Sequence, residues 1–161
     1  MFVTSEPHAQ VAACGGQIEK GRWSGYTASC LVLDQINKRW DESRMGNLTM
    51  ERTLSAVATL DHVGVFIVGG EGTNNLKTSE FLAAGSMEWQ EGPALRVNMR
   101  APCAVTITAT SFLAIYENNI HEFDVAIAGP TSSAGWRKAE HWPLLKTSRT
   151  SQPGCARWAK K

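Results

Sequence analysis

The chain has 161 residues, of which 43% are hydrophobic and 19% charged, and its formal net charge is +1. This length and composition describe one ordinary globular domain with enough chain to bury a sizeable core. The nearly balanced charge gives no general attraction to nucleic acid or to an anionic membrane. No apolar run approaches the ~20 residues of a membrane span, and no signal peptide is visible. A cytoplasmic location is therefore the default expectation, with an extracellular one left open.

The first part of the chain predicts an incomplete sheet. Met1–Gln10 is expected to be a disordered N-terminal segment, and Val11–Cys14 forms a strand that leads into the turn residues Gly15-Gly16. Nothing before Val11 supplies an innermost strand, so the chain is expected to begin inside a repeat. After a loop of Gly, Ser and charged residues, Ser29–Asp34 predicts a compact strand and Lys38-Arg39-Trp40 opens the next.

The middle of the chain predicts a complete sheet of four strands, because short β-branched or small-residue runs alternate with turn signals. The runs are Leu54–Leu60, Val65–Val68, Ser79–Ala84 and Glu88-Trp89-Gln90. Gly69-Gly70 ends the second of them, where the backbone needs a positive φ or a close approach to a neighbour.

The following stretch predicts a similar but degenerate sheet. Its runs are Pro102–Thr110, Phe112–Tyr116, Ile120–Val125 and Gly135-Trp136-Arg137. The diglycine is replaced by Glu117-Asn118-Asn119, where asparagine still tolerates a tight turn. Pro153–Trp158 then resembles the start of another inner strand.

These blocks recur at a nearly constant spacing. The glycine pairs Gly15-Gly16 and Gly69-Gly70 lie 54 residues apart, and steps of 49 and 47 residues separate Trp40, Trp89 and Trp136. A period near 50 residues with a diglycine and a tryptophan is typical of kelch propeller blades. The chain resembles the kelch-repeat family over essentially its whole length. The resemblance implies an all-β fold, a partial kelch-type β-propeller with about three four-stranded antiparallel blades at residues 11–51, 52–99 and 100–148 and a fourth starting at 149–161.

About three blades are fewer than the four to eight of a closed propeller. The chain is accordingly expected to be a fragment of a longer protein, an arc that closes by self-association through its open blade edges, or a tightly curled small assembly. A β-sandwich without kelch repeats is the structural alternative, because short strands with regular turns also suit that fold.

The repeat also suggests which residues are structural and which could bind a partner. The tryptophans are expected to pack between blades, and the glycines to serve backbone geometry rather than phosphate binding. Arg52, Arg100 and Arg149 recur at steps of 48 and 49 residues. In kelch domains that recognise acidic peptides, arginines at the matching position hold carboxylates in the central funnel, so the resemblance implies this role here. The alternative is that each arginine pairs with a neighbour in its own blade.

The four cysteines allow two readings. Cys14 and Cys30 lie on adjacent antiparallel strands, so a disulfide between them is geometrically possible. Cys103 and Cys155 occupy equivalent positions in successive blades, and a bond between them is not expected. Buried free thiols are the alternative for all four. No CxxC pair is present and the four histidines are scattered, which predicts no metal site and no cofactor.

Two function classes follow from the resemblance. One is a protein-interaction module whose loops bind a protein or an acidic peptide, as in ubiquitin-ligase adaptors or cytoskeletal scaffolds. The other is a fragment of a kelch-propeller enzyme similar to galactose oxidase or sialic-acid epimerase. No clustered histidines, carboxylate pair or Ser–His arrangement supports catalysis, so the sequence predicts a binding module and no enzyme. Fold resemblance alone does not settle function.

Overall fold

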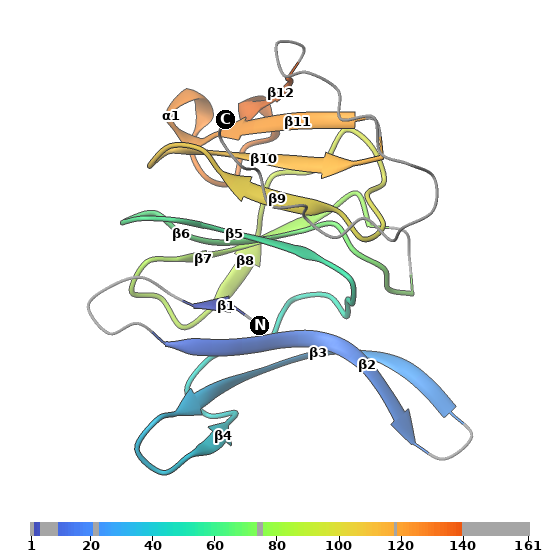
Figure 1. Ribbon diagram of the computed structural model, residues 1–161, viewed down its shortest axis with the longest axis vertical. Coiled ribbons are helices and arrows are strands. Elements are labelled where there is room, and N and C mark those ends of the chain that lie inside the picture. Colours follow the sequence, from blue (N-terminus) through green and yellow to red (C-terminus); the bar gives the residue numbers. More distant parts are fainter. Residues whose placement is uncertain (1, 4–9, 21–22, 74–75, 118, 140–161) are drawn as a thin grey trace, which may run out of the picture.

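The computed structural model describes residues 2–3, 10–20, 23–73, 76–117 and 119–139. Within these residues, twelve strands form three antiparallel sheets of four strands each, stacked one above another (Figure 1). In each sheet every strand pairs with the next one along the chain. The structure therefore confirms the predicted all-β class and the division into antiparallel four-stranded sheets.

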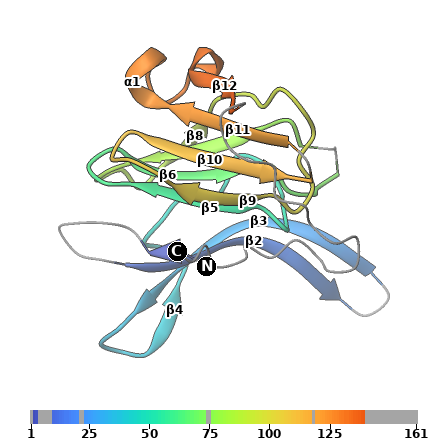
Figure 2. The ribbon, with the colours of Figure 1, turned by 45° about the horizontal axis from the view of Figure 1, so that its top comes forward.

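The first sheet differs from the prediction before and after the strand that begins at Val11. It contains β1 (Phe2–Val3), β2 (Val11–Lys20), β3 (Trp23–Asp34) and β4 (Arg39–Asp41). Because β1 pairs with the start of β2, the expectation that no strand precedes Val11 is wrong. The expected loop is wrong too, since a bulge between Cys14 and Gly16 lets β2 continue past the diglycine. The resulting two-stranded ribbon extends beyond the stacked sheets (Figure 2).

The second and third sheets repeat one another closely. Their strands are β5 (Ala56–Leu60), β6 (Gly64–Val68), β7 (Ser79–Ala83), β8 (Trp89–Glu91), β9 (Cys103–Thr106), β10 (Ser111–Tyr116), β11 (Asn119–Asp124) and β12 (Trp136–Lys138). Three of the four strands begin 47 residues after their counterparts (56 to 103, 64 to 111 and 89 to 136). The short helices α1 (Val125–Ala128) and η1 (Ser133–Gly135) join β11 to β12. Among the described residues, neither helix is long enough to cross a membrane.

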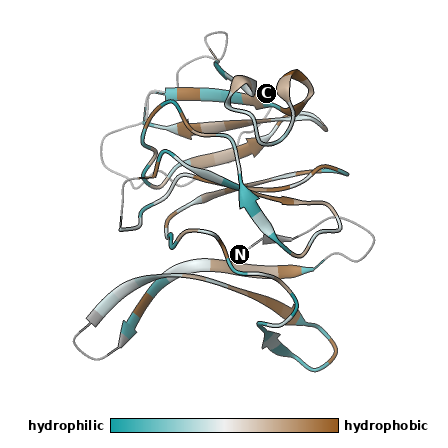
Figure 3. Ribbon diagram, turned by 180° about the vertical axis from the view of Figure 1, so that it is seen from behind, coloured by the Kyte–Doolittle hydropathy of each residue, from teal (hydrophilic) through white to brown (hydrophobic). Residues whose placement is uncertain are grey.

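The second sheet is sandwiched between the other two, and its strands reflect this position. All five residues of β6 are buried, because neighbouring sheets cover both of its faces. Phe66 packs against Phe112 and Phe123 of the third sheet, with ring centroids 5.2 and 5.5 Å apart. On the other face, Val65 and Ile67 pack with residues of the first sheet. Figure 3 shows hydrophobic stretches along the strands and a pale start of β3 at the free end of the β2–β3 ribbon.

The three repeated tryptophans occupy equivalent register positions. Trp40, Trp89 and Trp136 stand opposite Leu33, Leu82 and Phe123, respectively, on the neighbouring strand. Trp89 and Trp136 are only 7% and 2% exposed, because each faces the preceding sheet. The prediction of inter-sheet packing is therefore confirmed for these two residues. It is wrong for Trp40, which is 41% exposed because no described sheet precedes the first one.

Candidate functional site

The two diglycine pairs contact the segments in which the chain passes from one sheet to the next. Gly15 and Gly69 have φ values of +69° and +62°, a conformation that disfavours any side chain. The amide of Gly16 donates to the Arg52 carbonyl at 2.7 Å, and the amide of Gly70 donates to the Met99 carbonyl at 2.8 Å. The diglycine thus lets the segment leading into the following sheet closely approach the second strand of the sheet before it.

This repeated hydrogen bond shows that Arg52 and Met99 are equivalent residues, 47 positions apart. The left-handed residues Leu54 (φ 53°) and Ala101 (φ 51°) share the same spacing. Arg100 is therefore the counterpart of Thr53. The sequence alignment of Arg52 with Arg100 is shifted by one residue, so their side chains point into different environments.

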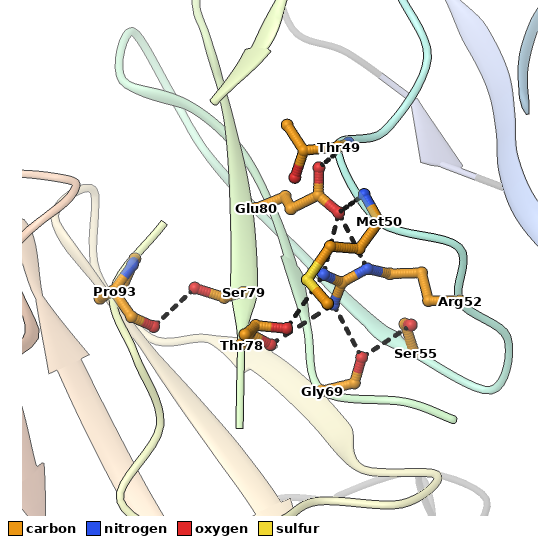
Figure 4. A network of polar contacts seen from close by, with 9 residues as sticks. All are labelled: Thr49, Met50, Arg52, Ser55, Gly69, Thr78, Ser79, Glu80 and Pro93. Carbon is orange, nitrogen blue, oxygen red and sulfur yellow. Dashed lines mark hydrogen bonds and ion pairs between the residues drawn. The ribbon is translucent and has the colours of Figure 1, made fainter. Parts of the chain in front are cut away.

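Arg52 is buried, with 1% of its surface exposed. Its Nε donates to Glu80 Oε1 at 3.0 Å, its Nη2 lies 2.9 Å from the same oxygen, and its Nη1 donates to the Gly69 carbonyl at 3.0 Å (Figure 4). Burial lowers the pKa of Arg52, whereas the carboxylate of Glu80 opposes this shift. Glu80 also accepts hydrogen bonds from the amides of Thr49 and Met50. Arg52 is thus held by an internal partner, and its predicted role in binding an external carboxylate is wrong.

Arg100 lies on the surface, where its side chain is 66% exposed. Its Nε is 3.1 Å from Glu71 Oε2, so Arg100 forms an ion pair with the preceding predicted blade rather than with its own. Solvent screens such surface pairs, which typically contribute 0–1 kcal/mol. Arg149 lies outside the described residues. The structure therefore does not bring Arg52 and Arg100 together in one carboxylate-binding ring.

The third sheet contains a buried histidine that the sequence analysis did not single out. Leu82 and Phe123 both stand opposite a repeated tryptophan, so the residues two positions earlier, Glu80 and His121, correspond. His121 is 6% exposed, and neither ring nitrogen has a hydrogen-bond partner within the described part of the chain. Burial lowers the pKa of the imidazole, and the positive charges of Arg96 and Lys138 lower it further. The only sequence signal would have been its position two residues before Phe123.

The cysteines are disulfide-bonded wherever the structure describes them. Cys14 and Cys30 face each other across β2 and β3 with a Cα–Cα distance of 4.1 Å, and the possible bond between them is formed. Cys103 is also disulfide-bonded. The alternative of buried free thiols is therefore wrong for these three positions. Cys155 lies outside the described residues.

A pocket of about 270 Å³ lies between the diglycine stretch of β2 and the segment that enters β5. Its walls are Ala13–Gly16, Arg52–Ser55, Val57 and Ile67. Leu54 is 52% exposed and adopts its left-handed conformation at this pocket. No group of three or more His, Cys, Asp or Glu side chains suited to a metal ion occurs among the described residues.

The candidate site is therefore not the predicted arginine ring. It consists of two open parts of the first sheet, the exposed tryptophan of β4 and the pocket beside β2. In comparisons with known proteins, no family model matches the chain. No curated protein matches it either.

Proposed function

We propose that the chain is a protein-interaction module built from kelch-type propeller blades. We further propose that it binds protein through the Trp40 face, defined as Val11, Leu31, Leu33 and Trp40. The strand register supports this definition, because Leu33 stands opposite Trp40, Leu31 is two residues from Leu33, and Val11 is two residues from the partner of Leu31 on β2. Residues two apart on a strand share one face. All four are apolar and are half-buried or exposed.

The observation that carries the proposal is the contrast among the three equivalent tryptophans. A neighbouring sheet buries Trp89 and Trp136, whereas Trp40 is 41% exposed in the same register position. A tryptophan with aliphatic neighbours is typical of the anchors that dominate protein interfaces. The face is thus suited to receive another apolar sheet surface.

The partner that we propose for the isolated chain is a second copy of itself. At the opposite end of the described stack, Leu113 and Ile120 are already buried, with 5% and 6% exposure. A head-to-tail contact through that end is therefore disfavoured. Two copies related by a two-fold axis can instead place their Trp40 faces against each other, which is the commonest symmetry of homo-oligomers.

The disulfide between Cys14 and Cys30 bears on where such a module works. Disulfides persist in oxidising compartments and are rare in the cytosol. The bond therefore favours an extracellular or otherwise oxidising setting over the cytoplasmic default.

Light scattering after size exclusion tests the proposal across a dilution series of the purified chain. We expect a discrete dimer whose dissociation shifts to higher concentration in Trp40→Ser, because the substitution removes the apolar anchor. Ile36→Ser is the control, because Ile36 is 90% exposed on the β3–β4 turn and lies outside the Trp40 face. A folded wild-type monomer throughout the series, or a dimer unaffected by Trp40→Ser, would overturn the proposal.

A further inference from the structure

The sequence contains a single Asn-X-Ser/Thr triplet, formed by Asn47, Leu48 and Thr49. This triplet is the acceptor sequence for N-linked glycosylation in secreted proteins, provided that its middle residue is not proline. The triplet alone carries little information, because three residues of this kind also occur together by chance. Whether it can carry a glycan depends on where the fold places the side-chain nitrogen of Asn47.

The triplet lies in the connection from β4 to β5, and its side chains alternate between solvent and core. Asn47 and Thr49 are exposed, whereas Leu48 is 5% exposed and packs between the first and second sheets. The Leu48 amide donates to the Ala28 carbonyl at 2.8 Å. The Thr49 amide donates to the carboxylate of Glu80. The fold thus holds the backbone next to Asn47 and leaves its side chain at the surface.

One hydrogen bond fixes the orientation of the Asn47 side chain. Cys30 is fully buried, so its amide needs an acceptor inside the fold, and Asn47 Oδ1 accepts from it at 3.1 Å. Only the oxygen of a side-chain amide can accept from an N–H group, which assigns Nδ2 to the other side. Within the described part of the chain, Nδ2 donates no hydrogen bond. The nitrogen that glycosylation modifies is therefore the unengaged end of the side chain.

The same contacts place Asn47 at the outer edge of the first sheet. The pairing of β4 with β3 covers only Val32–Asp34. Asn47 and Leu48 continue along this edge, with their hydrogen bonds to the backbone of Cys30 and Ala28. Asn47 is not among the residues of the Trp40 face. A substituent on the exposed Nδ2 therefore extends from the perimeter of the sheet and needs no space in the core.

The cysteines indicate that the chain passes through a compartment in which glycosylation takes place. Cys14 is bonded to Cys30, Cys103 is disulfide-bonded too, and no cysteine is free among the described residues. Disulfides form in the endoplasmic reticulum and persist in secreted proteins, which are also the proteins that carry N-linked glycans. The two features meet in the structure, since Asn47 is the acceptor for the amide of a bonded cysteine.

We infer that Asn47 is an N-glycosylation site. In the transfer, Asn47 Nδ2 forms a bond to the anomeric carbon of a lipid-diphosphate-linked oligosaccharide and loses one proton. The bond from that carbon to the diphosphate breaks, and the lipid diphosphate leaves. Oδ1 remains a carbonyl oxygen, so the hydrogen bond from Cys30 persists in the glycosylated protein. The inference rests on the oxidising setting proposed above and is independent of the Trp40 face.

Expression of the full chain in mammalian cells, behind a cleavable secretory signal sequence, tests the site. Lysate and medium are both analysed by electrophoresis before and after treatment with peptide N-glycosidase, so that retained chain is measured as well. We expect a mobility shift of one glycan that the glycosidase removes. Mass spectrometry should locate the resulting conversion of asparagine to aspartate at Asn47. The chain expressed without the signal sequence is the control and should show no shift.

Two variants of Thr49 separate recognition of the triplet from effects on folding. Thr49→Ala should abolish the shift, whereas Thr49→Ser should retain it because serine also completes the triplet. Both variants keep Asn47 and its hydrogen bond to Cys30. Both also keep the hydrogen bond to Glu80, because the Thr49 donor is the backbone amide. A shift that persists in Thr49→Ala would contradict the inference.

An Asn47 that is unmodified in both lysate and medium would overturn the inference. If such a chain has nevertheless formed the Cys14–Cys30 bond, the oxidising setting stands and only the glycosylation site fails. Peptide mapping without reduction measures this bond. A glycosylated chain that lacks the bond would also overturn the inference, because the folded site would then not accommodate the glycan. Dimerisation through Trp40 is measured separately, so its failure is distinguishable from both.

Discussion

The second and third sheets join their predecessors through the same backbone arrangement but with different side chains. In the second sheet, Arg52 and Glu80 form a buried ion pair at the junction. In the third sheet, the equivalent positions hold Met99 and His121, both buried. The hydrogen bond from the diglycine to the incoming segment is nonetheless present in both junctions, at 2.7 and 2.8 Å.

This difference shows which part of the repeat is essential to the junction. The glycine conformation and its hydrogen bond are kept, whereas the side-chain pair changes from charged to apolar and neutral. A buried ion pair is costly to desolvate, and apolar residues of similar volume can replace it with little loss. The Arg52–Glu80 pair is therefore one solution to filling the junction, and the third sheet contains another.

Breaking the ion pair on one side should have the largest effect. Glu80→Gln leaves the buried guanidinium of Arg52 without a counter-charge, and we expect the free energy of unfolding to fall by about 3–5 kcal/mol. The double variant Arg52→Met, Glu80→Gln removes the charge as the third sheet does, and it should recover most of this loss. Urea unfolding of the wild type, the two single variants and the double variant measures the coupling. A double variant as unstable as Glu80→Gln would contradict this reading of the junction.

Replacing a glycine of the shared junction geometry should lower stability by an intermediate amount. Gly69→Ala combines a φ of +62° with a new Cβ only 2.5 Å from the Met99 carbonyl, and it should cost more than backbone strain alone, which is roughly 1–3 kcal/mol. Gly85→Ala is the matched control, because Gly85 has a φ of +78° but no atom within 4 Å of the new Cβ. Thermal unfolding compares the two variants. Equal losses would mean that the close approach at the junction contributes nothing beyond strain.

The buried histidine of the second junction, between the second and third sheets, predicts a smaller effect on stability that depends on pH. The pKa of His121 is lowered in the folded chain, so the unfolded chain takes up its proton first as the pH falls. The contribution is fully present above an unfolded pKa of about 6.5, and it decreases as the pH falls below that value towards the folded pKa.

His121→Leu should therefore flatten the stability profile in this range relative to the wild type. The control is His62→Asn, which replaces an exposed histidine with a residue that tolerates its positive φ. Urea unfolding at a series of pH values measures both. A wild-type profile parallel to that of His121→Leu would exclude the imidazole as the titrating group.

The local residue pattern was sufficient to predict a strand where a short β-branched and aromatic run is buried. Val65–Val68 was predicted as a strand from its β-branched and aromatic run, and β6 spans Gly64–Val68. The facing positions of Cys14 and Cys30 followed from two strands joined by a single connection. In contrast, β2 was predicted to end at Gly15-Gly16. Its continuation depends on a bulge, and no local residue pattern distinguishes a bulge from a turn at two glycines.

The candidate site was less predictable, because it depends on exact register between sheets. A spacing of 48 residues paired Arg52 with Arg100, but the strands themselves repeat at 47, and this single residue separates a buried side chain from an exposed one. His121 was missed because the third strand begins 40 residues after its counterpart (79 to 119). The connection between β10 and β11 is shorter than the one between β6 and β7. Counting along the chain therefore cannot align Glu80 with His121.

By itself, the sequence determined the all-β class, the three strand-rich units and the recurrence of their tryptophans and glycines, because these follow from local propensity and periodicity. The tertiary structure alone decided which equivalent residues are buried. Trp40 is exposed and Trp89 is covered because one has no described sheet before it and the other has, which is a property of the stack and not of either residue.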